Sequence, residues 1–295
     1  MHTPETPPRP APPTTPGPVP PARRDPAVYE GLPGGIGVSL LRVYDWPAAD
    51  GLSGGTPHLH LTCTEGYAVV GGRGAVQTLT PAGFRQTPLT PGALVWFTPG
   101  TIHRLVNEGG LTLHVLMQNS GLPEAGDAVL TLPPHLLTDP ETYRAATALP
   151  PRGAHGSDED GRDDPDGPDG PDGLDGPDGE DGADAAVARA ARRRRDLAVE
   201  GFTALRAATE AGDPEPLAAF HRAAATLVAP LTSAWRERWR TGAAAAAAAT
   251  GAQLDALTKG DASHLAAAGV RAEQPVERGR FGMCGRLDVY GTGSA

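Results

Sequence analysis

Two histidines separated by a single leucine, His58 and His60, are the residues of this chain best suited to chemistry. Alternate residues of a β-strand point to the same face, so a strand over this HLH segment would direct both imidazoles into one space. Glu65 adds a carboxylate after a short bend, and His103 can add a third imidazole from a neighbouring strand. Three neutral nitrogens and one anionic oxygen suit a divalent transition metal. The donor set favours iron, manganese, nickel, cobalt, copper or zinc over calcium and magnesium.

The elements that must position these side chains are short apolar runs, interrupted by Gly and Pro, between about residues 35 and 131. The runs expected to form strands are 38–46, 58–63, 66–70, 75–79, 93–97, 103–107 and 111–117. The segments expected to form turns between them are 71–74, 80–83, 90–92 and 107–110. Many short strands at this spacing predict an all-β barrel or sandwich and not alternating strand–helix units.

Helices are expected after the strands. Asp139, Pro140 and Glu141 together form a helix start signal, and residues 185–258 have helical periodicity. The apolar stripe of one helix in this region consists of Leu217, Phe220, His221, Ala224, Leu227 and Val228. We expect the arginine run 192–195 to form the solvated start of a helix. We expect the helices to cover the mouth of the barrel or to support a homodimer.

Composition divides the chain into five parts. These are a disordered, Pro-rich tail (1–25), the barrel (26–150), an acidic Asp/Gly/Pro low-complexity linker (151–184), a small α-helical region (185–260) and a poorly specified tail (261–295). Alternation of apolar residues in 280–290 indicates a last strand within that tail.

The formal net charge of −10 is concentrated in the linker 151–184, which has 13 acidic residues against two arginines. The linker is therefore expected to repel itself and stay extended. The rest of the chain is close to neutral, and it offers no electrostatic case for binding nucleic acid.

No window of the sequence reaches the roughly 18 apolar residues that a membrane span requires, so no membrane association is expected. Cys63 and Cys284 are the two cysteines of the chain, too few for a disulfide framework. A cytoplasmic location is therefore the expectation.

The segment from His58 through Glu65 to Gly72 is similar to the first motif of the cupin superfamily, HxH-x(3,4)-E-x(6)-G. The segment from Gly92 to Asn107, which contains His103, resembles the second motif, G-x(5)-PxG-xx-H-xxx-N. Nineteen residues separate Gly72 from Gly92, an ordinary distance between cupin motifs. The resemblance covers about residues 35–131.

Two positions depart from the cupin pattern. Leu52 stands where a glycine is expected six residues before the first histidine, and the proline of the second motif is displaced by one place to Pro99. Both departures fall in expected turns, so they affect loop geometry more than they affect the metal ligands.

The resemblance implies an antiparallel cupin, or jelly-roll, barrel with a divalent transition metal inside. The implied ligands are His58, His60, Glu65 and His103. It also implies a small-molecule ligand in the barrel and either oxygenase-like or isomerase-like chemistry, between which it does not choose. The alternatives are that the histidines are ordinary core or surface groups, that the barrel is a non-catalytic binding or sensing module, or that the chain is a sugar-responsive transcription regulator. The last is less favoured because residues 185–258 show no compact helix-turn-helix.

Three further residues are candidates for the cavity wall. Tyr67 shares strand parity with Glu65 and can face the interior. Trp96 or its neighbour Phe97 must point inward, and alternation alone does not choose between them. His114 is a candidate for a cavity acid or base, with an exterior or core position as the alternative.

Overall fold

The computed structural model describes residues 31–151 and 182–291. The Pro-rich segment 1–25 and nearly all of the acidic segment 151–184 lie outside the described residues, so the expectations for both stay untested. Within the described part, the strands are β1 (Gly37–Val43), β2 (His58–His60), β3 (Glu65–Thr80), β4 (Gly83–Leu89), β5 (Leu94–Phe97), β6 (Ile102–Met117), β7 (Ala128–Leu130), β8 (Glu277–Phe281) and β9 (Gly285–Tyr290). The helices are α1 (Pro140–Thr147), α2 (Gly182–Glu210), α3 (Glu215–Val228), α4 (Thr232–Thr241) and α5 (Ala243–Thr258).

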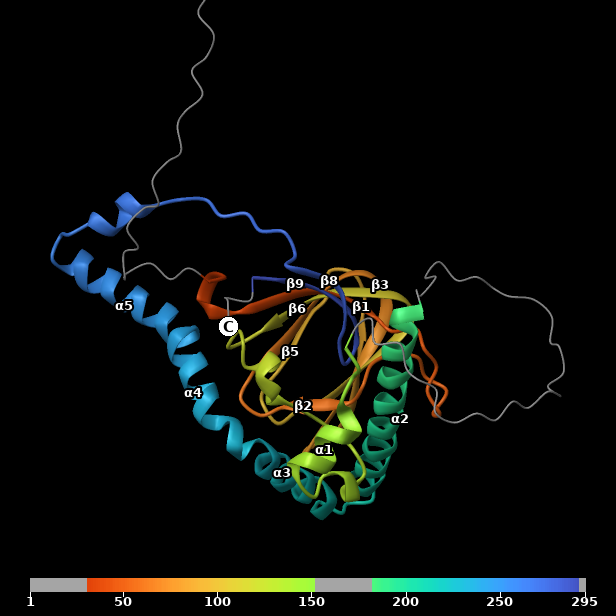
Figure 1. Cartoon of the computed structure of the whole chain (residues 1–295). Helices are drawn as coiled ribbons and strands as arrows, with labels where there is room; N and C mark the ends of the chain where they lie inside the picture. Colours follow the sequence, from red (N-terminus) through yellow and green to blue (C-terminus); the bar gives the residue numbers. More distant parts are fainter. Residues whose placement is uncertain (1–30, 152–181, 292–295) are drawn as a thin grey trace, which may run out of the picture.

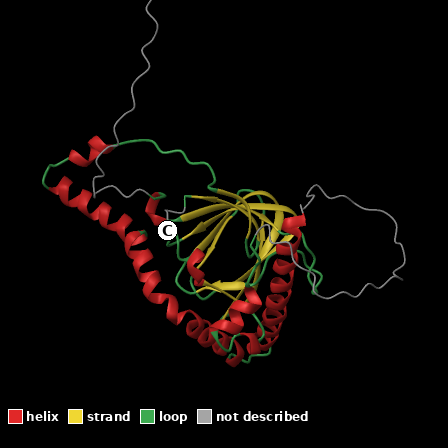
Figure 2. Cartoon of the chain, in the orientation of Figure 1, coloured by secondary structure: helices red, strands yellow, loops and turns green. Residues whose placement is uncertain are grey.

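The described strands form one antiparallel sheet that curves around an apolar interior (Figure 1). The main path is β4-β3-β6-β1-β9-β8, while β5 pairs with β3, and β2 pairs with β6 and with β7. In the described chain the two ends of this path do not pair, so the sheet is an open barrel and is not closed into a ring. A helical region follows the barrel, as the sequence predicts, so the all-β description applies to the barrel and not to the described chain as a whole (Figure 2).

Two long strands, β3 and β6, form the centre of the sheet, and each replaces two shorter strands expected from the sequence. The expected turns at 71–74 and 107–110 lie opposite one another, with Arg73 paired with Gly109. The register of β3 against β6 shifts there, so the glycines bend the two strands and do not reverse them. At Gly72 a Cβ would lie 2.2 Å from the carbonyl oxygen of Gly110, and φ is +67°, so only glycine fits this bend.

Two strands were not anticipated. β4 contains Pro88 and lies at the edge of the sheet, where a missing backbone donor is tolerated. β7 follows a turn at 123–127. It is only three residues long, and a strand of this length is too short to show a pattern of alternation.

The helices follow the expected apolar faces closely. Asp139 caps α1 by accepting hydrogen bonds from the backbone N–H groups of Glu141 and Thr142. The buried residues of α3 are Leu217, Phe220, Ala224, Leu227 and Val228. α2 packs on the barrel and contributes Ala198, Phe202 and Leu205 to the same core as β3 and β6. α4 and α5 continue along one side of the molecule, and none of the residues of α5 is buried (Figure 1).

The last part of the chain completes the barrel sheet. β8 and β9 form a hairpin, and β9 pairs antiparallel with β1, with Leu41 opposite Leu287. The expected strand within 280–290 is therefore present as a hairpin, and the tail is better ordered than its composition indicated. Sequence segments some 240 residues apart thus share one sheet.

The arginine run 192–195 does not start a helix, because α2 begins ten residues earlier at Gly182. The prediction that the run is solvated is also wrong for two of its four members. Arg192 and Arg193 are exposed, but Arg195 is 2% exposed and donates hydrogen bonds to the backbone oxygens of Trp46 and Pro47. Arg194 is also partly buried. Both of these arginines point from α2 toward the barrel, a direction that the charge of the run does not reveal.

Among the described helices, none combines the length and the apolar character needed to cross a membrane.

Candidate metal centre

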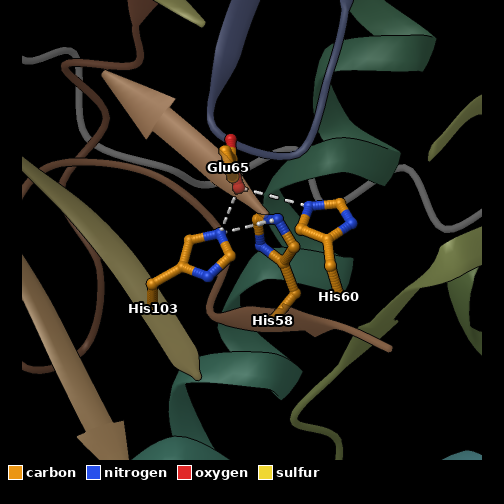
Figure 3. Close-up of side chains that lie close together, drawn as sticks. All are labelled: His58, His60, Glu65 and His103. Atoms are coloured by element: carbon orange, nitrogen blue, oxygen red, sulfur yellow. Dashed lines mark hydrogen bonds and ion pairs between the residues drawn. The ribbon is translucent and has the colours of Figure 1, made fainter. Parts of the chain in front are cut away.

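The four residues of the two sequence motifs come together inside the barrel (Figure 3). β2 places His58 and His60 on one face, β3 begins at Glu65, and β6 brings His103 directly opposite His58 in the pairing of β2 with β6. All four residues are buried, with at most 5% of each exposed. One donor atom from each side chain lies within 4.8 Å of the others. The buried group could therefore hold a metal ion.

Backbone carbonyls fix the tautomers of His58 and His103. The Nδ1 atom of His58 lies 2.8 Å from the Thr56 carbonyl oxygen, and Nδ1 of His103 lies 3.2 Å from the Thr101 carbonyl oxygen. A carbonyl oxygen only accepts, so each Nδ1 must carry the proton, and each neutral ring then has its lone pair on Nε2. These two Nε2 atoms face one another at 3.1 Å. Two lone pairs at this distance repel each other. A cation bound by both nitrogens would remove this repulsion.

Glu65 adds the anionic donor of the group. Its Oε2 atom lies 2.9 Å from Nε2 of His103 and 3.2 Å from Nε2 of His60. Oε2 is buried without a well-aligned hydrogen bond from the described residues, so these short distances reflect convergence and not a satisfied network. Such convergence of unsatisfied donor atoms is what a metal ion requires of its ligands.

The protonation preferences of the group follow from its burial. Burial lowers the pKa of His58 well below its ordinary value, so this ring is neutral. Burial would raise the pKa of Glu65, but the imidazoles of His103 and His60 outweigh it and hold the pKa well below its usual range. Burial also lowers the pKa of His60, but the neighbouring carboxylates of Asp127 and Glu65 outweigh it, so that the pKa rises to about 9. The two carboxylates thus make the surroundings of His60 favourable for positive charge.

Asp127 is a part of the site that the sequence analysis missed. Its Oδ2 atom lies 3.2 Å from Nδ1 of His60, while Oδ1 accepts hydrogen bonds from the backbone N–H and the hydroxyl of Thr62, at 2.8 Å and 2.7 Å. Asp127 is fully buried. A carboxylate on the remote nitrogen of a histidine ligand orients the ring and raises its basicity. No local pattern marks Asp127, because it lies in a turn and reaches His60 only through the pairing of β7 with β2.

Replacing Asp127 with asparagine should weaken metal binding by about 10- to 100-fold, since the carboxylate that orients His60 is lost while its size is kept. Competition with a chromophoric chelator measures this change. Asp139→Asn is the matched control, because Asp139 is exposed at the start of α1 and asparagine also caps helices well. Equal metal affinity of Asp127→Asn and the unaltered protein would show that His60 needs no such support.

Tyr67 and Phe97 lie inside the barrel beside the donor group. Tyr67 is fully buried, and the ring centroid of Phe97 lies 4.3 Å from that of His103. Phe97 pairs with Glu65 across β5 and β3, whereas the neighbouring Trp96 is 67% exposed. Trp96 therefore does not line the cavity beside the donor group, which corrects the sequence expectation. Alternation requires one of the two aromatic residues to point inward, and the β3–β5 register selects Phe97.

His114 also lies outside the metal cavity. On β6 the side chains of Leu113 and Val115 are buried, so the residue between them points to the outer face. There His114 lines a separate surface cavity with Val38 and Tyr290. The expectation that His114 is an acid or base in the barrel cavity is therefore wrong.

A cavity of about 300 Å³ adjoins the donor group. His58, His60 and Glu65 line one part of it, and Leu41, Val115 and Met117 of the barrel wall line another. Further lining residues come from α2 and from the C-terminal hairpin, which the sequence analysis did not connect with the site. The cavity is large enough for a small organic molecule beside a metal ion.

No family model matches the sequence, and the search of curated proteins gives no match. Solved structures that match part of this chain include Streptomyces PAC13 with uridine, which is 16% identical over 30% of this chain and 64% of that chain, with a TM-score of 0.23. Another is WlaRA, a TDP-fucose-3,4-ketoisomerase from Campylobacter jejuni, which is 12% identical over 30% of this chain and 64% of that one, with a TM-score of 0.25. A third is a putative sugar phosphate isomerase from Acidithiobacillus ferrooxidans, which is 28% identical over 28% of this chain and 47% of that one, with a TM-score of 0.22.

This chain spans less than two thirds of the length of each of these structures. The cupin resemblance of the two sequence motifs fits both the antiparallel sheet and the buried His/Glu group.

Proposed function

We propose that this chain is a metal-dependent, cupin-like protein that binds a small molecule in the barrel and transforms it by isomerase-like or oxygenase-like chemistry. The observation that supports this most strongly is the pair of facing Nε2 atoms of His58 and His103, 3.1 Å apart and next to the Glu65 carboxylate. A core histidine pair without a ligand would instead place a hydrogen-bond donor opposite each Nε2 lone pair.

The proposed ligands are His58, His60, Glu65 and His103. The carbonyls of Thr56 and Thr101 hold two of the rings with Nε2 toward the centre, and Asp127 does the same for His60. A divalent transition metal bound there would supply Lewis-acid or redox chemistry toward a substrate oxygen.

The side chains around the group exclude water from one side and leave the other side accessible. Phe97 and Tyr67 cover the donor atoms within the barrel, and the adjoining cavity gives a small molecule access to His58, His60 and Glu65. The phenol of Tyr67 stays protonated, because burial and the Glu65 charge raise its pKa well above its ordinary value. Tyr67 is therefore a hydrogen-bond donor, and not a base, at neutral pH.

Elemental analysis of the purified full-length chain tests the metal. We expect about one transition-metal ion per chain, either as isolated or after reconstitution with iron, manganese, nickel, cobalt, copper or zinc. Failure to retain any of these six metals would overturn the proposal.

A screen of small metabolites on the metal-loaded and metal-free protein tests the chemistry. Metal-dependent oxygen consumption identifies an oxygenase, and substrate rearrangement without oxygen consumption identifies an isomerase. Metal-dependent binding without turnover identifies instead a non-catalytic binding or sensing module.

A further inference from the structure

Part of the cavity beside the metal centre is built by segments outside the central barrel strands. The C-terminal hairpin contributes residues 280–284, and α2 contributes Arg194. In Figure 3 the blue ribbon of the hairpin lies beside Glu65, and the green turns of α2 lie behind the site. A molecule that occupies this cavity therefore meets the metal ligands on one side and Arg194 on another.

Among the described residues, the hydrogen-bond partners of Arg194 are backbone carbonyl groups. One Nη atom donates to the Gly282 carbonyl oxygen at 2.8 Å, and the other donates to the Thr147 carbonyl oxygen at 3.4 Å. Its Nε atom is buried and has no hydrogen-bond partner among the described residues. The guanidinium is thus fixed in position while a part of its donor capacity stays unused.

Among residues 31–151 and 182–291, no carboxylate lies within ion-pairing distance of Arg194. The two fully buried arginines differ in this respect, since Arg104 pairs with Asp50 and Arg195 pairs with Asp196. A partly buried cation without an anionic partner is costly, and the cost is offset when an anion binds to it.

The other charged side chains that line the cavity already have partners among the described residues. Arg280 lines the same cavity, but its guanidinium lies 3.4 Å from the Glu277 carboxylate. Glu65 faces the imidazoles, and Glu124 accepts a hydrogen bond from the backbone N–H of Gly121. Arg194 is therefore the cavity-lining cation that the described carboxylates leave unneutralised.

We propose that the small molecule bound beside the metal centre is an organic anion, whose carboxylate or phosphate group is bound by Arg194 while its other oxygens face the metal ligands. This inference rests on the proposed metal-dependent function and narrows its substrate class to acidic metabolites. Arginine suits this role because its planar fork of donors matches both carboxylate and phosphate oxygens.

The test uses the full-length protein loaded with cobalt, whose visible absorption spectrum reports changes at the metal independently of turnover. The probes are glycerol 3-phosphate, 3,4-dihydroxybutyrate and glycerol, which share a vicinal diol and differ in the attached charge. We expect both anions to bind at least about 10-fold more tightly than glycerol. Tighter binding of the phosphate would identify a phosphate ester as the substrate, and tighter binding of the carboxylate would identify a sugar acid.

Arg194→Met is expected to weaken binding of the anions by about 10- to 100-fold and to leave glycerol binding and the cobalt content unchanged. Arg193→Met is the matched control, because Arg193 is an exposed arginine on the same helix and does not line this cavity. If Arg194→Met does not fold, Arg194→Lys keeps the charge without the planar fork and is expected to bind the anions less tightly than the unaltered protein.

Glycerol binding as tight as anion binding, or unchanged anion affinity in a folded Arg194 variant, would overturn the anion site. Failure of the unaltered protein to bind cobalt would instead overturn the proposed metal function, so the two failures are distinguishable.

Discussion

Replacing His103 with alanine should reduce the metal content of the reconstituted protein from about one ion per chain to near zero. His103 is fully buried, and its Nε2 atom lies within 3.1 Å of both His58 Nε2 and Glu65 Oε2. Its removal therefore leaves an incomplete donor set in which Glu65 loses its nearest imidazole. Elemental analysis after dialysis against excess metal measures the loss.

His114→Ala provides a matched control on the same strand. His114 lies on β6 as His103 does, but it points to the outer face of the sheet, so its removal should leave the metal content unchanged. A stoichiometric ion in His103→Ala would show that His103 is not a metal ligand. Circular dichroism of both variants shows whether each still has its fold.

Gly201→Ala should destabilise the protein by about 1–3 kcal/mol or more, although alanine is the better helix former. Gly201 lies where α2 crosses the chain after β7, and a Cβ there would lie 2.0 Å from the carbonyl oxygen of Thr131. The neighbouring Thr131 hydroxyl donates to the Ala198 carbonyl oxygen at 2.8 Å, which fixes the close approach. The clash is with backbone atoms, so α2 must move away from the barrel. Chemical denaturation measures the change in free energy of unfolding.

Gly251→Ala separates this packing effect from helix propensity. Gly251 lies in α5, and a Cβ there would meet nothing within 4 Å, so the substitution should stabilise that helix by up to about 1 kcal/mol. A Gly201→Ala variant as stable as the unaltered protein would mean that α2 is not packed tightly on the barrel.

The sequence by itself determined the donor atoms of the candidate metal centre and most of the elements around it. The strand over His58 and His60, the start of α1 at Asp139 and the buried face of α3 all follow from patterns that span fewer than about 15 residues. Such patterns can be read locally, because side-chain direction repeats every two residues in a strand and every 3.6 in a helix.

Where a local pattern allowed two outcomes, pairing between distant strands selected one of them. Alternation required Trp96 or Phe97 to face inward, and the register of β5 against β3 chose Phe97. The Gly-rich segments at 71–74 and 107–110 suit both turns and bulges, and only their position opposite one another in β3 and β6 makes them bulges.

The tertiary structure alone decided which residues surround the donor atoms. Asp127 contacts His60 from a turn 67 residues away in the sequence. Arg194 lines the cavity from α2, a helix that comes after the long acidic segment. The same structure places the C-terminal hairpin on β1, where it closes part of the cavity. Contacts of this kind depend on how faces of separate elements pack against each other, and the charge or polarity of a residue within its own segment does not specify them.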